Sequence, residues 1–258
     1  MPPRVQLVPV SPSIASSYPI GAPRGSLKPL NSLTGGRMAA DAATALLALH
    51  TAVAAVGGDL RITDCYRSTA EQRAARARYD TWIAAGKPKP GSAGWNSATM
   101  KADYVAEPGF SFHNAGRSID LHVEALKFPA VAADQQLDRL WQICRPIGWS
   151  PVISAPTEGA TESWHLDYLG EWSPVRERRG YAEAAMAACL DIGGTGYGRD
   201  NERAIQAQLH RAGYDVGAID GVIGPRTTRA MQACGVGPGA SPEAFYRLPS
   251  SPTVLWRG

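Results

Sequence analysis

The sequence predicts a protein in two parts: a domain that mixes helices with short strands, followed by a small helical domain. Apolar residues recur at helical spacing between residues 37 and 56 and again between residues 133 and 147. Apolar and polar residues alternate from Ile119 to Val123, which is typical of a strand. From Glu171 the chain becomes charged and then Ala-rich, so we place a domain boundary in this region.

Composition narrows the class of protein. A chain of 258 residues has room for one large domain, or for one medium domain and one small one. The net charge of +3 is a mild basic bias and only a weak signal for an anionic polymer, such as a cell wall, as the partner. No apolar run is long enough to span a membrane, so we expect no membrane insertion. Nothing indicates nucleic-acid binding, and we expect a monomer.

The first 34 residues predict an irregular arm, because Pro, Ser and Gly interrupt every apolar stretch. No signal-peptide core is visible there, which favours synthesis in the cytoplasm without a secretion signal. The four cysteines lie far apart and form no CxxC pair, so no cysteine-ligated zinc site is expected. Free thiols are the expectation for Cys144 and Cys234, which lie in apolar helical patterns.

One turn in the first domain is well placed to present a side chain. A short strand is predicted from residue 60 to residue 63. A helix should begin near Thr69, because Ser68 and Glu71 have the spacing of a capping box. Arg67 therefore lies on the turn between strand and helix. A further strand is predicted over residues 162 to 168.

Two histidines and two acids have the composition of a catalytic zinc site. Such a site needs three protein ligands, an open position and a base. His113 and Asp120 are seven residues apart, and the turn between them can bring both side chains to one point. His165 is the best candidate for the third ligand, with Glu162 three residues before it. A hydrogen-bonded turn pair is the alternative for His113 and Asp120.

Three segments resemble, in order, the motifs of the zinc D-Ala-D-Ala carboxypeptidase and L-alanyl-D-glutamate peptidase family. SFHNAGRSID (residues 111–120) is similar to SxHxxGxAxD, ESWH (residues 162–165) to ExWH, and YRSTAEQ (residues 66–72) to the upstream YRS…Q segment. One departure is Ser118, where the family usually has Ala. The resemblance implies an α+β fold of Hedgehog and DD-peptidase type, in which helices flank a small, mostly antiparallel sheet.

The resemblance also implies roles for individual residues. One zinc ion would be held by His113, Asp120 and His165. Glu162 would take a proton from water and later protonate the leaving amine. The same resemblance implies that Arg67 polarises the scissile carbonyl or holds the oxyanion, and that Gln72 and Ser111 help to hold substrate. A structural salt bridge is the alternative for Arg67, and His122 is expected to be a bystander or to support the ligands from outside.

The C-terminal segment resembles a small peptidoglycan-binding domain. The shared elements are a Q-x-x-L helix from Gln206, a Gly-Tyr turn, the segment IDGVIGPRT and the helix that follows. Ile205, Leu209 and Ile219 are expected to form its core, and a purely structural helical cap is the alternative. The domains implied are an arm (1–34), a zinc peptidase (35–172), a linker and helix (173–197) and a wall-binding domain (198–248).

Both modules point to bacterial peptidoglycan as the substrate. The resemblance implies a zinc peptidase that cleaves stem peptides, of the bacteriophage endolysin type, with L-alanyl-D-glutamate endopeptidase activity and release to the wall through a holin. The alternatives are a D-Ala-D-Ala carboxypeptidase of wall metabolism and a non-catalytic wall-binding zinc protein. Cleavage of a cross-link would favour the endopeptidase, because lysis requires it.

Overall fold

A computed structural model describes residues 2–11, 14, 36–123, 126–154 and 162–251. The strands are β1 (Leu7–Pro9), β2 (Arg37–Ala39), β3 (Ile62–Asp64), β4 (Ser118–Leu121), β5 (Trp149–Pro151) and β6 (His165–Tyr168). The α-helices are α2 (Ala40–Ala55), α3 (Thr69–Ala84), α4 (Gln136–Cys144), α5 (Ser173–Arg179), α6 (Tyr181–Asp191), α7 (Asp200–Arg211) and α8 (Pro225–Ala233). None of the helices within these residues is long and apolar enough to cross a membrane.

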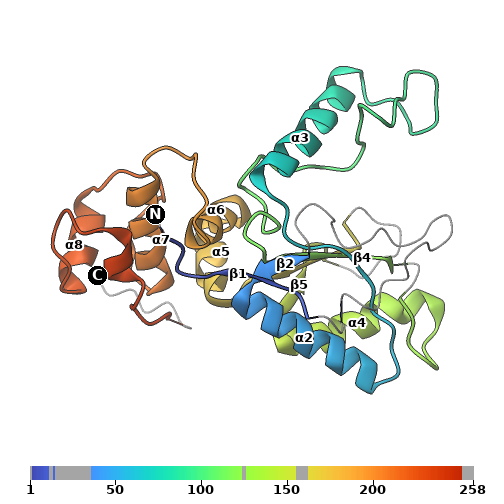
Figure 1. Ribbon diagram of the computed structural model, residues 1–258, viewed down its shortest axis with the longest axis horizontal. Helices are drawn as coiled ribbons and strands as arrows, with labels where there is room; N and C mark the ends of the chain where they lie inside the picture. The colour runs from blue at the N-terminus through green and yellow to red at the C-terminus, as the bar shows by residue number, and fades with distance from the viewer. Residues whose placement is uncertain (1, 12–13, 15–35, 124–125, 155–161, 252–258) are drawn as a thin grey trace.

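The first domain is built on a four-stranded sheet in the order β3-β4-β6-β5, with every neighbouring pair antiparallel. Helices α2 and α4 pack against each other on one side of it (Figure 1). Leu46 and Leu49 of α2, Ile119 of β4 and Trp141 of α4 belong to one buried cluster. The predicted α+β fold with a small antiparallel sheet is confirmed.

The beginning of the chain corrects two predictions. The arm was expected to be irregular, but Leu7–Pro9 forms strand β1, which pairs with β2 so that Leu7 lies opposite Ala39. For the same reason the helix predicted from residue 37 begins only at Ala40, because the three residues before it belong to β2. Most of the predicted arm, residues 12–13 and 15–35, lies outside the described residues.

The capping box predicted at the start of α3 is present. Ser68 Oγ accepts the backbone N–H of Glu71 at 3.2 Å, and the Glu71 carboxylate accepts the backbone N–H of Ser68 at 2.8 Å. Helix α3 and the loop after it extend away from the sheet (Figure 1).

Three other predicted elements are shorter or shifted. The strand expected at residues 60–63 is Ile62–Asp64, and the strand expected from Glu162 begins at His165. The helix expected over residues 133–147 is an α-helix only from Gln136 to Cys144, with tighter 3₁₀ turns at each end. Each difference lies at an element boundary, where helix ends fray or tighten into 3₁₀ turns.

The C-terminal helices share a buried cluster with the first domain. Ala184 and Leu190 of α6 and Ala207 of α7 pack in one cluster with Phe112 and Trp172. The charged segment that we placed at the domain boundary forms helix α5. Figure 1 shows α5 and α6 lying between the sheet and the terminal helices.

A smaller core holds the end of the chain together. Ile205 and Leu209 pack there with Met231 and Phe245, as expected for the first two, whereas Ile219 belongs to the cluster around α6. All four cysteines are free thiols; Cys234 is half-buried and the other three are buried.

Candidate metal centre

The register of two strands places the polar side chains of the site. Asp120 of β4 lies opposite His165 of β6, and Ser118 lies opposite Asp167. Side chains two residues apart on a strand share one face of the sheet, so these four residues project to the same side. The antiparallel pairing thus brings together residues that are distant in the sequence.

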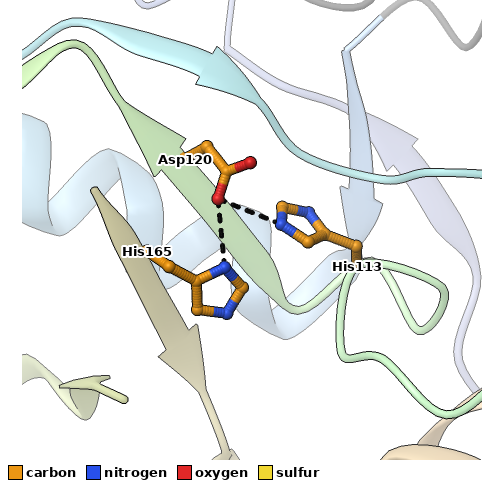
Figure 2. A group of neighbouring side chains, drawn as sticks. All are labelled: His113, Asp120 and His165. Carbon is orange, nitrogen blue, oxygen red and sulfur yellow. Dashed lines mark hydrogen bonds and ion pairs between the residues drawn. The ribbon is translucent and has the colours of Figure 1, made fainter. Parts of the chain in front are cut away.

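Figure 2 shows two imidazole rings converging on one carboxylate oxygen. Nε2 of His113 lies 3.1 Å from Oδ1 of Asp120, and Nδ1 of His165 lies 3.0 Å from the same oxygen. The three donor atoms lie within 4.8 Å of one another. Two imidazoles and one carboxylate form a common ligand set for catalytic zinc, because three protein ligands leave one position open. The donor set fits a zinc ion.

The outer nitrogen of each ring is also held. Nδ1 of His113 faces the backbone carbonyl of Cys65, and Nε2 of His165 lies 2.8 Å from Oδ1 of Asp167. With a metal bound, an N–H on each of these nitrogens would donate to its oxygen, and the lone pair of the other nitrogen would face the metal. Both imidazoles are therefore oriented as metal ligands without further rearrangement.

The charge of Asp120 is compatible with a ligand role. Burial by itself would raise the pKa of Asp120, but the contacts with His113 and His165 hold this pKa well below its usual value. The carboxylate is therefore ionised at neutral pH.

Glu162 lies beside the three donor atoms. Its Oε2 is 4.0 Å from Nδ1 of His165, and 27% of its side chain is exposed. Burial raises the pKa of Glu162 above its usual value. Its backbone has a φ of 66°, which is uncommon for a residue with a side chain and is found mainly where the surrounding structure imposes it. The role of Glu162 as the base stays a prediction.

Arg67 makes structural contacts and also borders the site. Its Nη2 lies 2.6 Å from Asp64 Oδ2 and 3.6 Å from Asp120 Oδ2. Its Nη1 donates to Oε1 of Gln72 at 2.9 Å. The salt bridge considered as an alternative therefore exists, yet it fixes the guanidinium beside a proposed ligand. The partner Asp64 was not predicted, although it is the last residue of β3 and lies only three residues before Arg67.

The two residues expected to hold substrate support their neighbours. The Gln72 amide accepts from Arg67 and donates to the backbone carbonyl of Ala106 at 2.8 Å. The hydroxyl oxygen of Ser111 accepts the backbone N–H of His113 at 3.3 Å. Both residues also line the cleft described below, and their contact with substrate stays a prediction.

A cleft of about 400 Å³ opens over the site. It is lined by Arg67, Gln72, Lys101, Asp103, Tyr104, Val105, Ala106, Ser111, His113, Asp120, Val152, Glu162, Trp164, His165, Arg176 and Tyr181. All seven residues singled out from the sequence are in this set. Trp164 is half-buried and also borders the cleft.

Asp167, Arg176 and Tyr181 were also missed in the sequence. Asp167 alternates with His165 along the strand, so the period of two places both on one face and could have revealed it. Arg176 and Tyr181 lie outside every recognised motif, and only packing brings them to the cleft. His122, just beyond the end of β4, does not belong to the donor cluster found in the described part of the chain.

Comparison with known families gives two matches. The family described as VanY, D-alanyl-D-alanine carboxypeptidase, matches residues 35–171, which is more than half of the chain. A peptidoglycan binding domain matches residues 199–234. No curated protein matches the chain.

Solved structures of two kinds are similar to the chain. One is a mutant of the vancomycin resistance D,D-pentapeptidase VanY in complex with Zn(II), with 22% identity and a TM-score of 0.37, covering 63% of this chain and 87% of that one. Another is the LD-carboxypeptidase LdcB, with 20% identity and a TM-score of 0.39, covering 64% of this chain and 68% of that one. The family assignment rests on the sequence match.

Proposed function

The chain belongs to the VanY family of D-alanyl-D-alanine carboxypeptidases, and on that premise we propose that it is a zinc peptidase that hydrolyses stem peptides of peptidoglycan. The observation that supports this proposal most directly is the convergence of His113, Asp120 and His165, with Glu162 beside them. The match to a peptidoglycan binding domain supports the same polymer as the partner.

The proposed ligands are His113 Nε2, Asp120 Oδ1 and His165 Nδ1. When bound, a zinc ion supplies Lewis acidity, which makes water a better nucleophile and polarises a carbonyl. Glu162 accepts the proton of the attacking water at Oε2 and donates it to the nitrogen of the leaving amine. In this scheme the atoms balance: one amide bond and one water give one carboxylate and one amine.

Arg67 is proposed to stabilise the negative charge that develops on the carbonyl oxygen. A guanidinium has five N–H donors, and the contacts to Asp64 and Gln72 leave donors free to point into the cleft. A donor that is held in place before the reaction stabilises the transition state more than a mobile one does. Asp64 and Gln72 provide that fixed position.

Two bonds in the stem are candidates, and a different observation favours each. The family description favours the terminal D-Ala-D-Ala bond. The match to a peptidoglycan binding domain favours an enzyme that acts on the assembled cell wall. On that ground we propose that the protein is a bacteriophage endolysin that cleaves the L-alanyl-D-glutamate bond. Binding to the wall would raise the local concentration of stem peptides at the cleft.

Mass spectrometry of digested, purified peptidoglycan tests the proposal. A new free amino terminus on D-glutamate indicates the endopeptidase, and released D-Ala indicates the carboxypeptidase. The role of Glu162 is tested with the variant Glu162→Gln, which keeps the shape of the side chain and removes the base. Hydrolysis should fall by roughly 10² to 10⁴-fold while zinc content is retained. Equal hydrolysis by both proteins would exclude Glu162 as the base.

Binding to the wall is tested separately, by pelleting of the Glu162→Gln protein with insoluble peptidoglycan. A truncation from residue 198 should abolish pelleting if the terminal helices bind the wall. Because Ala204 and Ala207 of α7 pack in one cluster with α6, the melting curve of the truncated protein must be compared with that of the full chain. A folded, truncated protein that still pellets would refute the tether.

A further inference from the structure

One wall of the cleft comes from helices that follow the family-matched segment. The match ends at residue 171, yet Arg176 of α5 and Tyr181 of α6 line the cleft together with Glu162 and His165. The chain therefore completes its cleft with residues that lie beyond the matched domain.

This wall is held firmly by packing. Trp172, just before α5, and Val175 within it are buried, and so are residues 184–191 of α6. The ring of Tyr181 meets Phe112 edge to face, with centroids 5.2 Å apart and an angle of 84° between the planes. Phe112 directly precedes the proposed ligand His113. The backbone that carries Arg176 is thus fixed relative to the donor atoms.

The charges of the cleft single out Arg176 among its cations. Arg67 pairs with Asp64 at 2.6 Å, and Lys101 pairs with Asp103 at 3.1 Å. Within the part of the chain that the structure describes, Arg176 forms no ion pair and its side chain donates no hydrogen bond, although the residue is half-buried. A guanidinium in a partly desolvated cleft is well suited to a carboxylate, with which it forms two parallel hydrogen bonds.

Resting on the proposed function, we propose that Arg176 is a specificity residue that binds a free carboxylate of the stem peptide, on a cleft wall formed by α5 and α6. Two carboxylates of a stem share this chemistry: the α-carboxylate of isoglutamate and the carboxyl terminus. Arg176 binds one of them when the scissile amide lies at the donor atoms. Tyr181 positions this wall by packing on Phe112.

Steady-state kinetics of Arg176→Gln test this assignment on a synthetic pentapeptide stem ending in D-Ala-D-Ala. Loss of a charge-assisted pair should raise KM roughly tenfold or more while kcat changes by less than about threefold. Arg73→Gln is the matched control, because Arg73 is exposed on α3 and does not line the cleft. Its KM should equal that of the wild type. An unchanged KM for Arg176→Gln overturns the proposal.

Amidated stems identify the carboxylate. One stem has isoglutamine in place of isoglutamate, and the other has a C-terminal amide. Amidation of the carboxylate that Arg176 binds should raise the KM of the wild type by the same factor as the Arg176→Gln substitution does. The KM of Arg176→Gln should not rise further when that carboxylate is amidated. If the increase in KM caused by Arg176→Gln is the same on the acid stem and on both amidated stems, Arg176 contacts neither carboxylate and the proposal is wrong.

Calorimetry separates this proposal from the proposed function. The acid stem is titrated into Glu162→Gln and into Glu162→Gln with Arg176→Gln, so no turnover is needed. Roughly tenfold weaker binding of the acid stem to the double variant than to Glu162→Gln supports the carboxylate site at Arg176. This result does not depend on which bond of the stem the enzyme hydrolyses. Equal binding to the two proteins overturns it. Melting curves of both proteins exclude loss of fold as the cause.

Discussion

Ser118 and Asp167 lie opposite each other in β4 and β6, and the Ser118 hydroxyl donates to Asp167 Oδ1 over 2.6 Å. The same oxygen accepts from Nε2 of His165 at 2.8 Å. Both groups are buried. The one departure from the family motif, a serine where alanine is usual, thus adds a donor that fixes the carboxylate behind a proposed zinc ligand.

Asp167→Asn should lower zinc affinity by about 10 to 100-fold, because the amide no longer holds the His165 imidazole as a charged acceptor does. Ser118→Ala should lower it only a few-fold, since it removes one hydrogen bond and restores the residue usual in the family. Competition with a chromophoric chelator measures both affinities. Unchanged affinity in Asp167→Asn would show that the contact does not tune the site.

Arg67→Lys keeps the positive charge but loses the branched guanidinium group that contacts both Asp64 and Gln72. We expect kcat to fall by roughly 10 to 100-fold with little change in KM, because a mobile ammonium stabilises the developing charge less well. Arg61→Lys is the matched control: Arg61 has the same kind of contact with Asp59, at 2.7 Å, and does not line the cleft. Equal kcat in the two variants would assign Arg67 a structural role only.

Gly116→Ala should destabilise the fold. Gly116 has a φ of 65°, and an added Cβ would lie 2.8 Å from the backbone nitrogen of Ala39 and 2.7 Å from the Leu7 side chain. Together, the strained φ and the clash should cost about 1 to 3 kcal/mol of unfolding free energy. Urea unfolding of the wild type and of Gly116→Ala measures this difference in unfolding free energy. Gly91→Ala is a useful comparison, because that glycine also has a positive φ but faces open space.

Acid should weaken the junction between the domains. Glu171 Oε2 lies 2.6 Å from Arg4 and 3.3 Å from Arg211, and Arg4 also pairs with Asp191 at 2.7 Å. Burial alone would raise the pKa of Glu171, but the two arginines hold this pKa below its usual value. A carboxylate with a lowered folded-state pKa stabilises the fold above its unfolded pKa, and this contribution is lost as pH falls through the folded value.

The unfolding free energy of the wild type should therefore fall more steeply below about pH 4.5 than that of Glu171→Gln. About a third of the Glu171 side chain is exposed, so screening limits the difference to roughly 1 kcal/mol or less. Thermal unfolding from pH 3 to pH 7 measures both curves, with Glu177→Gln on the exposed side of α5 as the control. Parallel curves for wild type and Glu171→Gln would contradict the expectation.

Local chemistry determined much of this protein directly from its sequence. The capping box of Ser68 and Glu71 sets the start of α3, because both partners lie within four residues. The alternation around Asp120 indicates a strand, because its period depends only on the backbone. The motif residues His113, Asp120 and His165 could be named as candidate ligands because each motif is short and ordered along the chain.

Only the tertiary structure decided how these pieces meet. The pairing of Asp120 with His165 depends on the register of two strands whose paired residues are 45 positions apart in the sequence. The strand in the arm forms because Leu7 pairs with Ala39 of β2. Arg176 reaches the cleft because α5 and α6 bury their apolar faces on the first domain. Burial and strand register are properties of contacts between distant segments, so neither segment determines them by itself.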